Sequence, residues 1–218
     1  MKSILTLLLA TLASFGFAQQ SDSTSMRSRN IRDGFIENYT ALKADKNVKN
    51  GFAEILFLER KIASGQYKNN TRTGQWKFYL LNGEIDQIYN YTTKRVEFET
   101  KNNSSSFKID NSNPGDEVIP PVKIGGTYAG ILVMSKITAR MLDFRSKKGS
   151  YEVNYIYQLD KQGVVKQIEL KVSGPDYNQS QYIDLQLFKP QELDFLPAMV
   201  NKTPISSTFT INTKIISN

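Results

Sequence analysis

The chain has 218 residues, with 28 Lys and Arg against 21 Asp and Glu, a formal net charge of +7, and neither cysteine nor histidine. Without these two residue types, histidine-based acid–base catalysis, Ser-His-Asp and Cys-His nucleophiles, and the usual zinc sites are excluded for this chain. Its basic residues are scattered rather than clustered, which indicates a solvated surface and no nucleic-acid groove. Stability must therefore come from burial rather than from disulfides.

The first residues predict export. Met1–Ala18 has the pattern of a secretory signal peptide, in which Lys2 provides the positive start and Ile4–Phe17 the apolar region before a small-x-small cleavage site. This apolar run is too short for a comfortable membrane span, so we expect no stable membrane span after signal cleavage. The mature protein is expected to be periplasmic or secreted, with a flexible, Ser-, Thr- and Arg-rich lead-in at residues 19–34.

Residues 35–100 are predicted to form an antiparallel β-meander. Phe35–Leu42 fits either a first edge strand or a short helix, and Phe52–Leu58 is apolar on both faces, as expected of a buried strand. Lys61–Tyr67 leads into a central hairpin, and Lys94–Thr100 extends the sheet.

The central hairpin, Gly65–Tyr91, is the most informative stretch of the chain. Asn82-Gly83 divides it into two strands and suits the two positive φ angles of a type I′ turn. Trp76 and Phe78 alternate with polar residues before the turn. The hairpin is therefore expected to have one apolar side.

This hairpin resembles the MORN-type repeats of bacterial β-meander proteins. The resemblance covers roughly residues 39–100 and is carried by the pattern G-x-Y-x-N-x-x-R-x-G-x-W-x-F-Y, followed by N-G and a second tyrosine strand. The matching residues are Gly65, Tyr67, Asn69, Arg72, Gly74, Trp76, Phe78, Tyr79, Asn82, Gly83 and Tyr89. In such repeats the aromatic side chains usually stack along the sheet, which implies core packing. The alternative is an aromatic platform that binds a ligand, with Tyr67, Trp76, Tyr79 and Tyr91 as its candidate residues.

The composition changes at residues 101–117, where Asn, Ser and Asp dominate and a Pro-Gly pair follows, so a linker is predicted there. A second domain is expected at residues 118–218. Its predicted elements are a helix at Tyr128–Phe144 capped by Thr127, a hairpin of Tyr151–Leu159 and Ile168–Val172 turning at Asp160–Gly163, a short helix at Gln179–Phe188, and a last strand at Ile205–Ile215. The expected fold class is therefore α+β, with an N-terminal antiparallel meander and a C-terminal antiparallel sheet with two helices.

The order helix, hairpin, helix, strand resembles the C-terminal domain of TonB-like energy transducers. The residues that carry this resemblance are Pro121, Gly125, Gly126, the turn at Asp160–Gly163, Phe195, Pro197, Ala198, Asn201, Pro204 and Ile205. Two features depart from the family pattern. The usual Tyr-Pro-x-x-Ala segment is replaced by Asp143-Phe144-Arg145-Ser146, and neither an uncleaved membrane anchor nor a long Pro-rich spacer is present in the sequence. The resemblance implies a TonB-like fold for this domain, whereas the departures argue against energy transduction.

No catalytic constellation is found in the sequence. Ser105-Ser106-Phe107-Lys108 is formally an S-x-x-K motif, but it lies in an Asn- and Ser-rich segment without helix propensity. The acidic residues Glu97 and Glu99 are interpreted as surface carboxylates, and no acidic stretch matches a calcium-binding loop. We therefore expect a protein that is not an enzyme and has no cofactor.

Two functions remain. The first is an exported, non-enzymatic envelope protein that binds other proteins by β-strand edge pairing, with Ile205–Ile215 as the preferred edge and Ile205, Thr208, Thr210 and Asn212 as its candidate residues. Its partner is an unknown envelope protein or a second copy of the chain in a homodimer. The second function is glycan or cell-wall binding through exposed aromatic residues of the meander.

Overall fold

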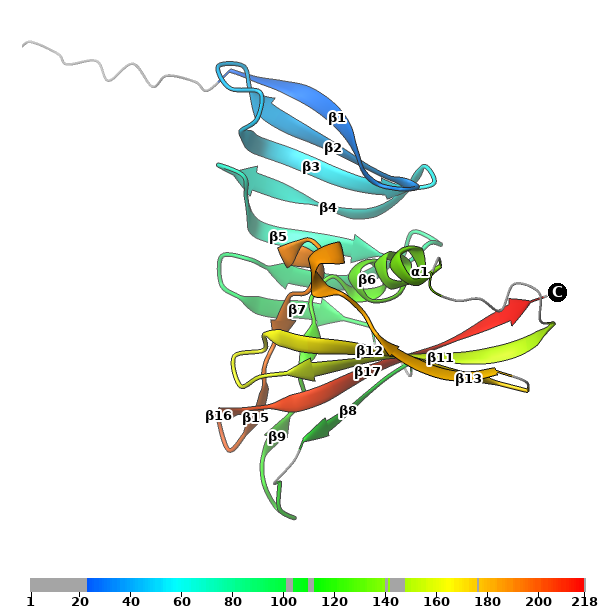
Figure 1. Ribbon diagram of the computed structural model, residues 1–218. Coiled ribbons are helices and arrows are strands. Elements are labelled where there is room, and N and C mark those ends of the chain that lie inside the picture. Colours follow the sequence, from blue (N-terminus) through cyan, green and yellow to red (C-terminus); the bar gives the residue numbers. More distant parts are fainter. Residues whose placement is uncertain are drawn as a thin grey trace, which may run out of the picture.

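The computed structural model describes residues 23–100, 104–109, 112–139, 141, 148–175 and 177–217. The predicted signal peptide lies outside these residues. Two large antiparallel sheets dominate the described residues, and the one α-helix found in them lies between these sheets, on the face of the second sheet that is turned toward the first (Figure 1).

The first sheet is a seven-stranded antiparallel meander in which each strand pairs with the next along the chain. Its strands are β1 (Thr24–Arg32), β2 (Phe35–Leu42), β3 (Lys49–Phe57), β4 (Arg60–Lys68), β5 (Thr71–Tyr79), β6 (Ile85–Asn90) and β7 (Arg95–Glu99). The predicted meander is thereby confirmed, and the open choice for Phe35–Leu42 is decided in favour of a strand. Trp76 and Phe78 are both fully buried on one face of β5, as their alternation predicted.

Strand β1 corrects the prediction of a flexible lead-in for the residues that it contains. It pairs with β2 along its length, and the Arg29 guanidinium lies 2.7 Å from the buried Glu37 carboxylate. Arg32 makes a second ion pair of 2.7 Å with Glu192 from the far end of the chain. Strand β1 is held by backbone hydrogen bonds and ion pairs and has no apolar alternation. It therefore lacks the pattern by which a strand is detected in a sequence.

The hairpin turn at Asn82-Gly83 is not of type I′, because only Gly83 has a positive φ, +91°. Its N–H donates to the Leu80 carbonyl at 2.9 Å, and the Asn82 side chain accepts from the Glu84 N–H at 3.1 Å. This side-chain bond holds Asn82 in a longer turn. Paired positive φ angles, typical of type I′ turns, occur instead at Leu58-Glu59, Asn69-Asn70 and Asn201-Lys202.

The second sheet has five strands in the order β13-β12-β11-β17-β8. They are β8 (Ser105–Ile109), β11 (Gly149–Leu159), β12 (Val165–Gly174), β13 (Tyr177–Tyr182) and β17 (Ser207–Ser217). Two small ladders flank this sheet, one joining β9 (Val118–Ile119), β15 (Ala198–Val200) and β16 (Thr203–Ile205), and the other joining β10 (Val122–Lys123) and β14 (Phe195–Leu196). The predicted hairpin of β11 and β12 is confirmed, and its alternating apolar residues are buried.

The predicted α+β class with two helices is wrong, and the protein is mostly β. The described residues contain one helix of 11 residues, in which η1 (Tyr128–Leu132) is wound as a π-helix and continues into α1 (Val133–Thr138). Residues 142–147, at the end of the predicted helix, lie outside the described residues. Thr127 occupies the N-cap position but makes no side-chain capping bond.

The second predicted helix, Gln179–Phe188, is replaced by β13 and a single 3-10 turn, η2 (Leu185–Leu187). A further 3-10 turn, η3 (Pro190–Glu192), follows. Gln179 and its neighbours pair with β12, and these polar side chains suit a solvated edge strand. Pairing with an existing sheet stabilises the segment more than a short, weakly amphipathic helix would.

The predicted linker also contains regular structure. Its residues 105–109 form β8, which pairs with β17 from Ser207↔Ile109 to Ile211↔Ser105. The linker prediction is therefore wrong for these five residues, while residues 101–103 and 110–111 lie outside the described ones. Composition favoured a linker because Asn and Ser are rare in strands, but β8 requires only backbone pairing at the sheet edge.

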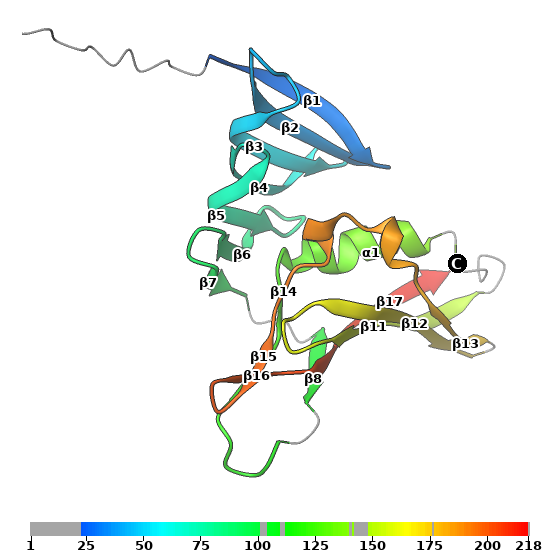
Figure 2. The same cartoon turned by 60° about the vertical axis from the view of Figure 1, so that its left-hand side comes forward.

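One apolar core joins the two sheets, and Tyr128 is at its centre. The Tyr128 ring stacks on Phe78 with centroids 6.4 Å apart and lies 5.9 Å from Phe35, both in the meander. On its other side the helix packs on the buried side chains of the second sheet, including Val153 and Tyr155. Figure 2 shows the helix between the sheets in a second view.

Replacement of Trp76 by alanine should cost roughly 3–5 kcal/mol of unfolding free energy, as for other large-to-small changes in a core. The indole is fully buried, donates to the Gln66 carbonyl at 3.0 Å, and lies where a side chain at Gly65 would collide with it. Urea denaturation provides the measurement, and Phe98→Ala, at an exposed aromatic of β7, serves as the control. Equal denaturation midpoints for the two variants would contradict the assignment of Trp76 to the core.

Candidate functional site at the junction of the sheets

Three of the four aromatic residues considered for ligand binding gather at one place. Tyr67 and Trp76 are buried with ring centroids 5.2 Å apart, and Tyr91, half-buried, lies 6.2 Å from Trp76. Tyr79 is separate from them, on the opposite face of β5, where its hydroxyl lies 3.1 Å from that of Ser64. Tyr67 and Trp76 therefore form core and do not offer an exposed stacking surface.

The preferred edge strand is not an edge along its first half, where three of its candidate residues lie. Thr208, Thr210 and Asn212 lie in β17, between β11 on one side and β8 on the other. Ile205 belongs to β16 instead, where it pairs with Ala198. The prediction is wrong because the partner strand, β8, comes from the segment predicted to be a linker.

Strand β8 takes over the free edge of this sheet, since among the described strands only β17 pairs with it. The Asn212 N–H donates to the Ser104 carbonyl at 2.7 Å. Because hydrogen-bonded pairs alternate along an antiparallel ladder, Ser106 directs its backbone groups toward β17, while Ser105 and Phe107 direct theirs to the free side. Phe107 is 47% exposed, so this edge also carries apolar surface.

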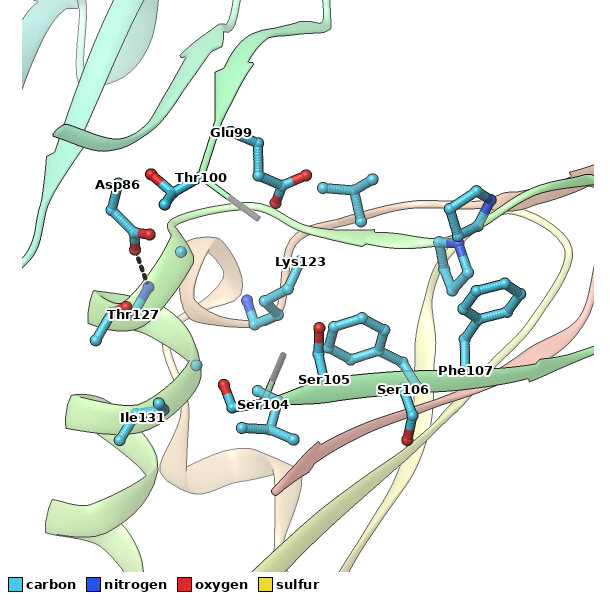
Figure 3. Close-up of a pocket in the computed structure, with 17 residues that line it drawn as sticks. Asp86, Glu99, Thr100, Ser104, Ser105, Ser106, Phe107, Lys123, Thr127 and Ile131 are labelled. Carbon is cyan, nitrogen blue, oxygen red and sulfur yellow. Dashed lines mark hydrogen bonds between the residues drawn. The ribbon is translucent and has the colours of Figure 1, made fainter. Parts of the chain in front are cut away.

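A pocket of about 320 Å³ opens beside β8, between the two sheets (Figure 3). Its walls are formed by β8, β17, the helix, β10 and the end of β7. The residues that line it are Asp86, Glu99, Thr100, Ser104, Ser105, Ser106, Phe107, Pro120, Pro121, Val122, Lys123, Gly126, Thr127, Gly130, Ile131, Phe209 and Ile211. In the figure, Ser105 and Phe107 point toward the pocket and Ser106 points away, while Glu99 and Thr100 lie on the opposite wall.

The corner at Gly125-Gly126 fixes the geometry of this pocket. The Thr127 N–H donates to the Asp86 carboxylate at 2.6 Å, and the Gly125 N–H donates to the Gln87 side-chain carbonyl at 2.8 Å. Gly126 has a φ of +50°, and a Cβ there would collide with the Asp86 carboxylate. The two glycines thus allow the chain to approach β6 closely.

The rim of the pocket is acidic. Burial raises the pKa of Glu99, and the charge of Asp86 adds to this effect, although a hydrogen bond from the Gln87 amide at 2.9 Å opposes it. Two carboxylates in a partly buried place favour a positively charged group of a ligand, because such a group would stabilise their ionised forms.

Lys123, on the inner wall, is a buried cation without an ion pair among the described residues. Its side chain is 5% exposed, and its Nζ donates to the carbonyls of Ile124 at 3.2 Å and Asp194 at 3.3 Å. Burial lowers the pKa of Lys123 to about 7, against the partial opposition of the Asp194 and Glu192 charges. The amine therefore exchanges its proton near neutral pH.

Ser105 and Lys108 of the S-x-x-K motif are three residues apart on a strand, so they lie on opposite faces and cannot exchange a proton directly. Among the described residues no cluster of three or more Asp or Glu side chains has the arrangement to hold a metal ion.

The chain matches no known protein-family model, no curated protein and no solved structure. Within the part of the chain that the structure describes, no helix has the length and apolar character needed to cross a membrane.

The stability of the protein should rise with pH between about pH 7 and 9.5, and Lys123 should account for much of the slope. The folded-state pKa of this lysine lies near 7, below the ordinary value of about 10.4, so the unfolded chain binds more protons in that window. Lys123→Met should therefore flatten the dependence of unfolding free energy on pH, as measured by urea denaturation.

The unfolding free energy of Lys123→Met should still depend on pH to some extent, because burial also lowers the pKa values of Lys49 and Lys189. Lys77→Met, at an exposed position of β5, is the matched control and should keep the full slope. If the unfolding free energy depended on pH equally in the Lys123 and Lys77 variants, the lowered pKa of Lys123 would be contradicted.

Gly126→Ala should destabilise the protein more than Gly83→Ala does. Both glycines have positive φ, so each substitution carries strain of roughly 1–2 kcal/mol. Only at Gly126 does the new Cβ meet another group, the Asp86 carboxylate, which should add about 1–3 kcal/mol as in other overpacked sites. Denaturation midpoints of the two variants give the comparison, and equal losses would show that the corner does not depend on close approach.

Proposed function

We propose that this protein is an exported, non-enzymatic interaction module of the cell envelope that binds an extended peptide along the free edge of β8. The observation that carries the proposal is the position of this edge, which has unpaired backbone groups at Ser105 and Phe107 and borders a pocket with apolar walls. Peptides that add a strand to a sheet gain affinity from backbone hydrogen bonds and specificity from pockets that take alternate side chains.

The proposed ligand has a definite pattern. Side chains of an added strand that face the helix would enter the pocket, where Ile131, Phe209 and Ile211 favour an apolar group. At the rim, Asp86 and Glu99 favour a lysine or arginine. We therefore expect an extended segment in which an apolar residue and a basic residue point to the same side, two positions apart.

Export and the two family resemblances belong to this proposal. The sequence of Met1–Ala18 supports secretion to the periplasm or the medium. The seven-stranded meander supports a MORN-like N-terminal region. A helix followed by a hairpin and a last strand supports a TonB-like C-terminal region, which here has β13 in place of the second helix.

Ser105→Pro should weaken peptide binding by about tenfold or more while leaving the fold stable. The substitution removes one backbone donor from the free side of β8, and proline is tolerated on an edge strand when its N side faces solvent. Ser106→Pro is the matched control, because its backbone faces Thr210 in β17. It should destabilise the protein by roughly 1–3 kcal/mol through an unsatisfied ladder group.

Peptides for this test come from a displayed library selected on the wild-type protein, and affinities are measured by calorimetry. Hydrogen exchange on the wild-type complex should show new protection at the Ser105 and Phe107 amides. If the enriched peptides bound the Ser105→Pro variant as tightly as the wild-type protein, peptide binding along the free edge of β8 would be refuted. A dimer that forms in the absence of peptide and dissociates in the same variant would identify a second copy as the occupant.

A further inference from the structure

A second pocket lies on the far side of the junction, around Arg72. It has a volume of about 530 Å³ and is separate from the one beside β8, with no lining residue in common. Its walls are Arg29, Asn47, Lys49, Tyr67, Asn70, Thr71, Arg72, Tyr91, Pro190, Gln191 and Asp194. These residues come from strands and turns of the meander and from residues 190–194 of the C-terminal region.

Arg72 is the unusual member of this set. Its side chain is 8% exposed, its guanidinium carbon lies 4.1 Å from the centre of the Trp76 ring, and its Nη1 donates to the Tyr91 hydroxyl at 2.9 Å. The other two nitrogens, Nε and Nη2, are buried without a hydrogen-bond partner among the described residues. No described carboxylate lies within ion-pair distance of it, and an arginine cannot lose its charge in a protein.

Neighbouring acidic groups do not satisfy this guanidinium. Glu37 is committed to Lys49 and Arg29, each at 2.7 Å, and also accepts from the Tyr67 hydroxyl at 2.9 Å. Asp194 lines the pocket and acts on Arg72 only at a longer range. The pocket walls carry three cationic side chains, Arg29, Lys49 and Arg72. Against these stand the Asp194 carboxylate of the wall and the adjoining Glu37 carboxylate, which leaves one positive charge in excess.

We propose that this pocket binds a small ligand with one carboxylate, which accepts hydrogen bonds from Nε and Nη2 of Arg72. The planar guanidinium matches a carboxylate in a two-bond geometry, and the single excess positive charge matches a monoanion. The tyrosine rings and the amides of Asn47, Asn70 and Gln191 provide surroundings for a ring or a peptide backbone attached to the carboxylate. Since Nε and Nη2 are buried, the ligand reaches them through a movement of the pocket wall.

Two sources of the carboxylate are distinguished by the probes. Glucuronate represents a sugar acid and N-acetyl-alanine represents a peptide C-terminus, while glucose and N-acetyl-alaninamide are their uncharged counterparts. The test follows the Arg72 Nε–Hε signal by NMR in the purified wild-type protein at constant ionic strength. We expect a saturable shift of this signal with at least one of the acids and affinity about tenfold or more weaker for its neutral counterpart. The proposal would be overturned if neither acid gave a saturable shift, or if the neutral compounds bound with the same affinity as the acids.

Variants give an independent readout. Arg72→Met keeps an unbranched chain on Trp76 without the charge and should abolish the rise in Tm that the binding acid produces. Arg60→Met, at an exposed arginine of β4, is the matched control and should retain that rise. If Arg72→Met does not fold, Arg72→Lys preserves the charge without the planar fork and should bind the acid at least about tenfold more weakly. A wild-type response in either Arg72 variant would overturn the proposal.

Discussion

The arrangement of the molecule depends on the burial of one aromatic ring, Tyr128, between the two sheets. The meander has a single apolar face, and such a face must be covered by another element to be stable. Tyr128 covers it from the start of the only described helix, with its ring stacked on Phe78 and tilted against Phe35. A buried aromatic ring of this size contributes a few kcal/mol through its area alone. Burial also raises the pKa of its hydroxyl, so the ring remains neutral.

Placing Tyr128 there brings backbone groups close to the meander, and these groups need partners. The side chains of Asp86 and Gln87 supply them for Thr127 and Gly125, and the Gln87 amide also donates to the Lys123 carbonyl at 3.0 Å. The corner is therefore held by side chains of β6 and by the backbone of the segment from β10 to the start of the helix. Both pockets have walls from the meander and from the C-terminal half of the chain.

The sequence predicted the elements whose stabilisation comes from apolar alternation. The strands around Trp76, the hairpin of β11 and β12, and the buried rows at Tyr155 and Leu170 all follow from period-two patterns. It failed for β1, β8 and β13, which are rich in polar residues and are held mainly by backbone pairing. Strands β1 and β13 pair with the strand adjacent to them in sequence, whereas β8 pairs with a neighbour far along the chain, β17. A local pattern contains no information about such a neighbour.

The same limit explains which functional residues were found. Tyr67, Trp76 and Tyr91 were selected as candidate residues of an aromatic platform, and they do come together, but around Arg72, which no local pattern singled out. Arg72 was present in the sequence only as one position of the MORN-type pattern. A buried arginine inside a row of aromatic residues is the signal that could have singled it out, because an unpaired cation is rarely placed in a core without a function.

Arg72 and Lys123 together show how the junction distributes its charge. Both cations are buried, and both act on Asp194, whose pKa burial raises while the two cations oppose that rise. One carboxylate that contacts neither of them within ion-pair distance cannot compensate two charges. Lys123 can become neutral by losing a proton, since its pKa lies near 7. Arg72 has no such option. The uncompensated charge of the junction is therefore fixed on the guanidinium, which is the charge that the proposed carboxylate ligand would neutralise.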